Sequence, residues 1–193
     1  MGRTAVIAIC RACRRLCMTS EPEVWVDTDV ASHENADSAI DAVRSVFPDW
    51  QPESMLASNG FPCDERMFTL TGKAPGTTTL LEFCKRQRIL DTALDAMSVD
   101  RGDSAAMFHL SRQAALVGKV AFVLSGERVL GGVMRVTLVG SGISDWLRQV
   151  TWHPGRGDVP RAVDDDLAMT GTGESMEWFD EKGRPTMRHI DDD

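Results

Sequence analysis

The sequence lacks the motifs by which many enzymes and cofactor-binding proteins are recognised. Its 193 residues contain no phosphate-binding GxxxxGK, no zinc-binding HExxH and no GxSxG nucleophile turn. Gly140 and Gly142 follow an expected strand, but the third glycine and the distal acid of a dinucleotide-binding loop are missing. No candidate acid, base or nucleophile is arranged with a partner. We therefore expect a protein that is not an enzyme and that uses no cofactor.

Cysteine and long apolar runs are also scarce. The five cysteines form an odd set that does not suit a disulfide framework, and reduced thiols indicate a cytoplasmic protein. Cys10 and Cys13 have metal-ligand spacing, but with Cys17 they supply only three of the four ligands of tetrahedral zinc, so no metal site is expected. No apolar run approaches the roughly 20 residues that cross a bilayer, which excludes a membrane-spanning helix.

Lysine is rare beside arginine, and glutamate is rare beside aspartate. The chain has 4 Lys against 17 Arg and 19 Asp against 10 Glu, and its net charge is −8. This composition resembles that of proteins from salt-loving archaea, where excess negative charge maintains solubility. Nucleic-acid-binding domains are usually basic. Any RNA-binding surface on this protein must therefore be a local Arg/Lys patch on an acidic domain.

Charge and apolar content divide the chain into three regions. Residues 1–18 carry a net charge of +4, and we expect an unstructured extension, with Met18 as a candidate for the true start. Residues 19–153 carry −6 and have ample apolar content for one core, so we expect a single domain. Residues 154–193 also carry −6 and are rich in Gly and Asp, which predicts a mostly disordered tail.

Alternation and helical spacing predict an α+β domain. A strand is expected over residues 23–30, and a helix from about Asn35 to the stop at Pro48. Thr79 and Glu82 match a capping box at the start of one long amphipathic helix that ends at Gly102. The other expected elements are strands over 50–57, 65–73, 104–110, 120–124 and 129–139, turns at 58–62 and 111–115, a bulge at Gly131-Gly132, and a helix over 144–149.

The long helix combines an apolar stripe with a basic side. The stripe, which must face the sheet, consists of Leu80, Phe83, Gln87, Leu90, Leu94 and Met97. Lys85 and Arg88 project from the opposite side, and Arg86 lies at the edge of the stripe. Glu82 with Arg86, or Arg88 with Asp91, would also form ordinary surface ion pairs. Helical spacing alone leaves both interpretations of these cations open.

The order of the elements fits a split βαβ antiparallel sheet with helices packed on one face. Three segments, Phe47-Pro48-Asp49, RQRILDTA at 86–93 and QAALVGKV at 113–120, resemble an archaeal family with a proposed role in RNA binding. The fold of that family is grouped with ribosomal large-subunit protein five, and some members are named after an operon shared with dephospho-CoA kinase. The resemblance spans Glu23 to Trp152. The family has Asn-Lys before its Gln-Ala-Ala, whereas this chain has Ser111-Arg112.

The resemblance implies a non-catalytic RNA-binding protein, with ribosomal or transfer RNA as expected partners. The candidate contacts are Lys85, Arg86, Arg88, Arg112, Gln113 and Lys119. The helical cations would meet phosphates, and the turn residues would reach sugars, base edges or a kinked backbone. A second hypothesis is a protein-interaction or nucleotide-binding module linked to coenzyme A synthesis, in which the arginines hold carboxylates or phosphates. No membrane partner is expected, and the sequence leaves the oligomeric state open, a homodimer included.

Overall fold

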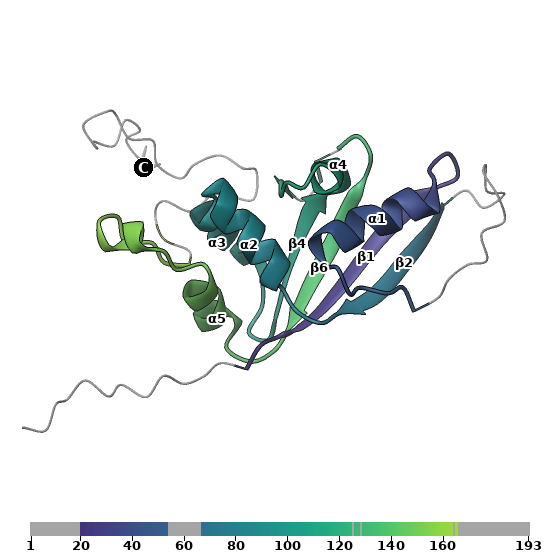
Figure 1. Ribbon diagram of the computed structural model, residues 1–193. Helices are drawn as coiled ribbons and strands as arrows, with labels where there is room; N and C mark the ends of the chain where they lie inside the picture. Colours follow the sequence, from purple (N-terminus) through teal and green to yellow (C-terminus); the bar gives the residue numbers. More distant parts are fainter. Residues whose placement is uncertain (1–19, 54–66, 125, 128, 164, 166–193) are drawn as a thin grey trace, which may run out of the picture.

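A computed structural model describes residues 20–53, 67–124, 126–127, 129–163 and 165, and Figure 1 shows how they are arranged. The expected extension over 1–18, the expected turn at 58–62 and most of the expected acidic tail lie outside these residues. Within the described residues, helices pack on an antiparallel sheet of six strands. The expected α+β class is therefore confirmed.

The first strand and helix form where local patterns predict them. Strand β1, Glu23–Ala31, buries every second residue, as its alternating sequence requires. Helix α1, Ala36–Val46, begins after Asn35, whose Oδ1 accepts a hydrogen bond from the backbone N–H of Asp37 at 2.8 Å. This bond satisfies one of the free donors at the helix start.

The sheet is antiparallel throughout, but its connections differ from the expected topology. The other strands are β2 (Met67–Ala74), β3 (Asp100–Arg101), β4 (Ala105–Ser111), β5 (Phe122–Val123) and β6 (Val133–Val139). Their order is β2-β1-β6-β4-β3, and β5 pairs with β4. A split βαβ unit would place β1 and β2 parallel, on either side of a third strand. Here these two strands, joined through α1, are direct antiparallel neighbours, so the split βαβ prediction is wrong.

The strand expected over residues 50–57 does not form in its described part, residues 50–53. Pro52 has no N–H to donate to a strand partner. Trp50 is instead fully buried, and the backbone N–H of Glu53 donates to the carbonyl oxygen of Thr71 at 2.8 Å. A Cβ at Gly72 would clash with the Gln51 carbonyl oxygen, so this loop crosses β2 where the strand has no side chain.

The single long helix of the sequence prediction is two helices. Helix α2 covers Thr78–Gln87 and helix α3 covers Leu90–Val99, and Arg88 between them has the left-handed φ of 59°. Because of this break, the C-terminal end of α2 contacts the turn at 118–120, whereas α3 packs against β4 and helix α5 (Ile143–Val150). The expected capping box does not form, because α2 already begins at Thr78 and its N-cap makes no side-chain hydrogen bond.

The segment between β4 and β6 is more helical and more tightly turned than expected. Residues 112–116 form a short helix, α4 (Arg112–Leu116), where a turn was predicted, and the Ser111 hydroxyl at its N-cap accepts from the Ala114 N–H. Gly118, two residues after this helix, has a positive φ of 69°. Gly131 and Gly132 have φ values of 77° and 74° in the turn before β6, so the predicted bulge within that strand is wrong.

The folded region extends beyond the expected boundary at residue 153. A short 3-10 helix, η1 (Pro154–Gly157), continues from α5, and we call residues 153–163 the C-terminal strap. The strap crosses α3: Arg156 donates to Asp91 at 2.9 Å, and Arg161 donates to Asp95 at 2.5 Å. Burial raises the pKa of the Asp95 carboxyl, and Arg161 offsets only part of this rise. This part of the expected disordered tail is therefore structured.

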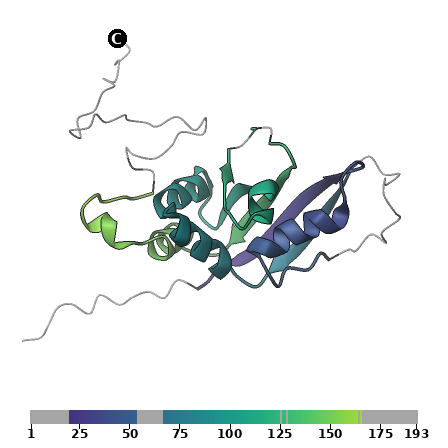
Figure 2. The same cartoon turned by 45° about the horizontal axis from the view of Figure 1, so that its top comes forward.

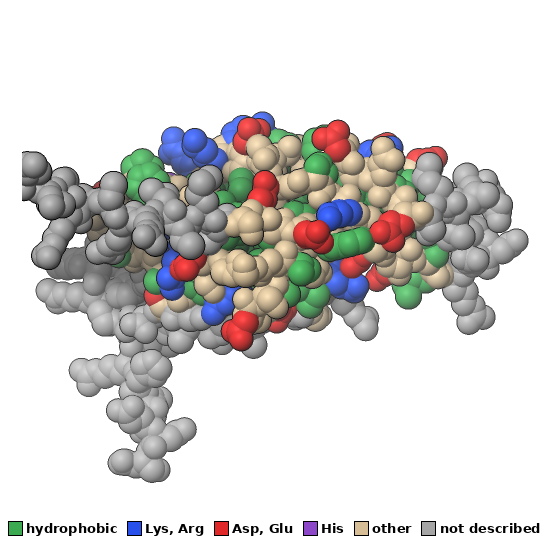
Figure 3. All heavy atoms as spheres, turned by 90° about the horizontal axis from the view of Figure 1, so that it is seen from below, with side chains coloured by type: hydrophobic (Ala, Val, Ile, Leu, Met, Phe, Trp, Pro, Cys, Tyr) green, Lys and Arg blue, Asp and Glu red, His purple; other side chains and the backbone are tan. Residues whose placement is uncertain are grey.

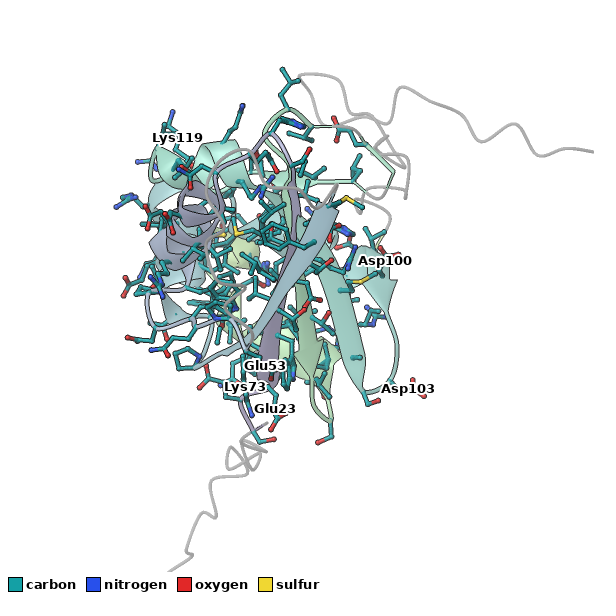
Figure 4. All side chains as sticks on the ribbon, turned by 90° about the vertical axis from the view of Figure 1, so that its right-hand side faces the viewer. Glu23, Glu53, Lys73, Asp100, Asp103 and Lys119 are labelled. Atoms are coloured by element: carbon teal, nitrogen blue, oxygen red, sulfur yellow. The ribbon has the colours of Figure 1, made fainter. Side chains whose placement is uncertain are left out.

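Helices cover one side of the sheet, as Figure 4 shows from the edge. Helices α1 and α4 lie side by side, α1 against β1 and α4 against β4, whereas α2, α3 and α5 form a second group (Figure 2). The core lies between these helices and the buried residues of β1, β4 and β6. No helix among the described residues is both long enough and apolar enough to cross a membrane.

Candidate nucleic-acid interface

The C-terminal end of α2 is fastened to the turn that follows α4. Arg86 Nη2 donates to the carbonyl oxygen of Gly118 at 3.0 Å, and its guanidinium lies 4.6 Å from the centre of the Phe83 ring. The Gln87 side-chain amide meets both the N–H and the carbonyl of Val120, each at 3.4 Å. These bonds bring Lys119 beside the cations of α2, although the two segments are about 30 residues apart in the chain.

Arg88 ends α2 in a conformation that normally belongs to glycine. Its N–H bonds to Lys85 O at 3.1 Å and the Ile89 N–H bonds to Cys84 O at 3.0 Å, the bond pattern of a Schellman motif. An L-residue with φ of 59° loses about 1–2 kcal/mol relative to its relaxed conformation. The Arg88 side chain is exposed and has no ion-pair or hydrogen-bond partner among the described residues. No hydrogen bond or ion pair with the described residues therefore explains why this position holds an arginine.

We expect Arg88→Gly to raise the free energy of unfolding by up to about 1 kcal/mol, because the relief of backbone strain exceeds the added entropy of the unfolded chain. Chemical denaturation of the variant and the wild type measures this difference. Lys85→Gly, in the right-handed turn just before, is the matched control and should be destabilising by about 1 kcal/mol. A destabilised Arg88→Gly variant would show that the arginine side chain does stabilise the fold.

Lys85 and Arg88 line a groove between α2 and the residues that follow α5. The groove has a volume of about 920 Å³, and its apolar wall includes Leu81, Leu90 and Val150. Trp152, with 61% of its surface exposed, also lines the groove. A large aromatic side chain and two cations without partners among the described residues thus line the same open groove.

A partly buried polar network includes two residues that line this groove, Asp91 and His153. Asp91 accepts from Arg156 Nε at 2.9 Å and lies 2.9 Å from His153 Nε2, while Arg156 Nη2 donates to the Thr151 hydroxyl at 3.1 Å. Burial raises the pKa of Asp91, but the hydrogen bonds and charges of Arg156 and His153 outweigh it, and the pKa lies below its ordinary value. Asp91 therefore stays ionised and is occupied by partners within the protein.

Arg112 and Gln113 do not join this surface as the sequence predicted. Arg112 is 4% exposed, and its Nη2 contacts both Glu34 carboxylate oxygens, at 2.6 and 2.8 Å, while Nε donates to Gly131 O at 2.7 Å. The guanidinium lies so close to Gly132 that a Cβ there would clash with it. Gln113 is exposed, but its side chain lies against Gly131. The expected role of Arg112 in contacting RNA is contradicted by its burial in an internal ion pair.

Trp152 and His153 were not predicted from the sequence as residues of a site. Nothing in the local pattern distinguishes an exposed tryptophan after a short helix from one that packs inward, as Trp146 does. Cys84, a candidate by residue type alone, is buried, and burial raises the pKa of its thiol to about 12. It is therefore protonated at neutral pH and serves as a core residue.

Charges of both signs are mixed on one face of the molecule. Figure 3 shows basic and acidic side chains interspersed over the face seen from below, with no broad field of either sign among the coloured side chains. Figure 4 places Lys119 on the helical side of the sheet, and Asp100 and Asp103 near the opposite edge. We call the exposed cations Lys85, Arg86, Arg88 and Lys119 the basic corner.

The comparisons with known proteins place the fold among archaeal proteins, and no family model matches the chain. The chain is 27% identical over 136 residues to a UPF0201 protein of Aeropyrum pernix, which covers 68% of this chain and 88% of that protein. It is also 27% identical over 100 residues to a UPF0200/UPF0201 protein of Archaeoglobus fulgidus. That match covers 52% of this chain but only 28% of the longer relative.

Two solved structures share the arrangement of helices and strands. The UPF0201 protein of Methanococcus jannaschii has a TM-score of 0.57 at 22% identity, covering 69% of this chain and 96% of that one. A second UPF0201 crystal structure has a TM-score of 0.55 at 23% identity, covering 74% and 97%. Similarity at these identities establishes the fold alone. The chain is thus UPF0201-like, a distant homologue of these archaeal proteins with the same α+β fold.

Proposed function

We propose that this protein is a non-catalytic RNA-binding module that contacts phosphates through the basic corner. One observation carries the proposal: Lys85, Arg88 and Lys119 are exposed together, with no side-chain partner among the described residues, on a chain of net charge −8. Cations on acidic proteins readily find carboxylates, as Lys73 and Arg148 do here. A group of unpaired cations is therefore available to an external polyanion.

The position of Arg86 also supports the proposal that this surface holds the RNA backbone in a defined orientation. Arg86 uses one nitrogen on Gly118 and keeps other donors free, and arginine can hold a phosphate with two parallel hydrogen bonds. Such directional contacts lose less affinity at high salt than contacts that depend on released counterions. That property would suit the salt-loving host that the composition suggests. The proposal also includes the fold relationship that the sequence resemblance implies, a likeness of this domain to ribosomal large-subunit protein five.

The test is the affinity for a fluorescein-labelled RNA hairpin with a single-stranded loop, measured by anisotropy from 50 mM to molar salt. The triple variant Lys85→Gln/Arg88→Gln/Lys119→Gln should bind about 10- to 30-fold more weakly at low salt. The slope of log affinity against log salt should also fall by about 2, since each lost phosphate contact removes about 0.7. Because these side chains are exposed and make no hydrogen bond or ion pair with the described residues, the variant should melt at the wild-type temperature.

The matched control is Arg44→Gln/Lys73→Gln/Arg148→Gln, which removes the same charge from exposed positions elsewhere on the protein. It should change the affinity by no more than about two- to threefold. Equal losses in both variants would mean that only total charge matters, and the basic corner would not be the site. Absence of binding by the wild-type protein at every salt concentration would refute the RNA proposal. Binding of a free nucleotide without RNA binding would favour the nucleotide-binding alternative.

A further inference from the structure

We infer that the groove between α2 and Trp152 holds one unpaired nucleotide of the bound RNA, with its base on Trp152 and its phosphate on Lys85 and Arg88. This inference rests on the proposed RNA-binding function and adds what the site recognises. The groove volume of about 920 Å³ lies within the range of small-molecule sites, roughly 300–1,000 Å³. It therefore has room for a nucleotide.

Trp152 is held in place although its side chain is exposed. Its N–H bonds to Gln149 O at 3.3 Å, at the end of α5. The preceding Thr151 is fully buried and donates to Leu147 O at 2.7 Å, and the following His153 contacts Asp91. Anchors on both sides keep the backbone of Trp152 fixed. An exposed aromatic side chain carried on a fixed backbone is a suitable stacking platform for an unpaired base.

The charges of the groove select a ligand with an anionic end and an apolar end. Lys85 and Arg88 have no partner within the described residues, whereas the Asp91 carboxylate already contacts Arg156 and His153. Glu82 is the remaining acid of the lining, and it lies one helical turn before Lys85. Lys85 and Arg88 are therefore available to bind the phosphate, and the apolar wall of Leu81 and Val150 is available to contact the base and sugar.

The recognised base must be unpaired. A base inside an A-form duplex is stacked on both faces and cannot enter a groove, whereas loops and single strands offer bases that can be splayed out. The left-handed Arg88 fits the same site. Its backbone is strained, and its guanidinium lines the groove without a hydrogen-bond or ion-pair partner among the described residues. Binding of a phosphate would give this side chain a role that accounts for the strain.

The experiment compares single-stranded A10 RNA with a blunt, GC-rich RNA duplex of the same length, using the full chain. Wild-type protein should bind the single strand more tightly, and binding should quench part of its tryptophan fluorescence. Trp152→Ala should weaken binding of the single strand about tenfold, as loss of one stacked base does, and leave binding of the duplex unchanged. Trp152→Phe keeps an aromatic face, so it should bind within about threefold of wild type while losing the quenching.

The outcomes separate this inference from the proposed function. If Trp152→Ala binds A10 as the wild type does, while the basic-corner variant loses affinity, the nucleotide site is refuted and the RNA function stands. Equal binding of single strand and duplex by the wild type would also refute it. If the wild type binds neither RNA at any salt concentration, the proposed function fails and the inference fails with it. Because Trp152 is 61% exposed, its variants should keep the wild-type melting temperature, which verifies that they are folded.

Discussion

Leu94→Ala should lower the free energy of unfolding by about 3–5 kcal/mol. Leu94 is fully buried on α3, the helix that packs against β4 and α5, so its truncation removes apolar contacts and leaves a cavity. Two-state chemical denaturation at neutral pH measures the difference. The expected loss is a large fraction of the stability of a domain of this size.

The matched control is Thr92→Ala, two residues earlier on the exposed side of the same helix. Its effect should stay within about 0.5 kcal/mol, since the change removes no buried contact. If Thr92→Ala were the more damaging substitution, α3 would present a different face to the core than the structure shows. The position of Asp91 in the lining of the groove would then also be wrong, because Asp91 lies on the same helix.

Arg112→Met should cost about 2–4 kcal/mol at neutral pH, the second large effect that we expect. The substitution leaves the Gly131 carbonyl without its donor and leaves the Glu34 carboxylate, whose side chain is 24% exposed, without its cation. Arg112→Lys should also be destabilising, because one ammonium cannot reproduce the fork between Glu34 and Gly131. If the Lys variant is measured where it is folded, its RNA affinity should equal that of the wild type.

Arg148→Met is the control for the loss of a cation from an ion pair. Arg148 and Asp145 have side chains that are 49% and 73% exposed, so this variant should lose less than about 1 kcal/mol. Equal effects of the two substitutions would show that the Arg112–Glu34 pair contributes no more than a surface pair. Loss of RNA affinity in a folded Arg112→Lys protein would instead restore Arg112 to the contact surface.

The destabilisation by Arg112→Met should depend on pH. Burial raises the pKa of Glu34, but the Ala31 N–H and the bonds and charge of Arg112 outweigh it, so the pKa in the folded protein lies below its ordinary value. A lowered carboxyl pKa stabilises the fold fully above the unfolded value of about 4.3, and that contribution is lost as the pH falls through the folded pKa. The difference between wild type and Arg112→Met should therefore shrink in this acidic range. A difference that stays constant down to pH 2 would contradict the role of Glu34.

Local chemistry in the sequence was sufficient to predict the first strand and the first helix. The alternation in β1 and the Asn35 cap of α1 each depend on neighbouring residues alone. Lys85 and Arg88 were also correctly placed on the exposed side of the expected helix, since helical spacing determines which residues oppose the apolar stripe.

The break at Arg88 was not predictable from that spacing. Residues 80–97 keep a helical apolar period through the break, and arginine is a good helix former. What ends α2 is the docking of Gln87 and Arg86 on the backbone of 118–120, contacts that span about 30 residues of the chain. Tertiary contacts therefore outweighed the local preference of this segment for one continuous helix.

The sequence by itself determined the α+β class, the local caps and turns, and the existence of a basic surface on α2. The tertiary structure alone decided which cations remain available and what lies beside them. Arg112 is removed from the surface by Glu34, 78 residues away, and Trp152 is brought to Lys85 by a strap whose Arg156 binds Asp91, 65 residues away. Charge and periodicity describe a residue and its near neighbours, whereas burial and pairing depend on partners that only the folded chain brings within reach.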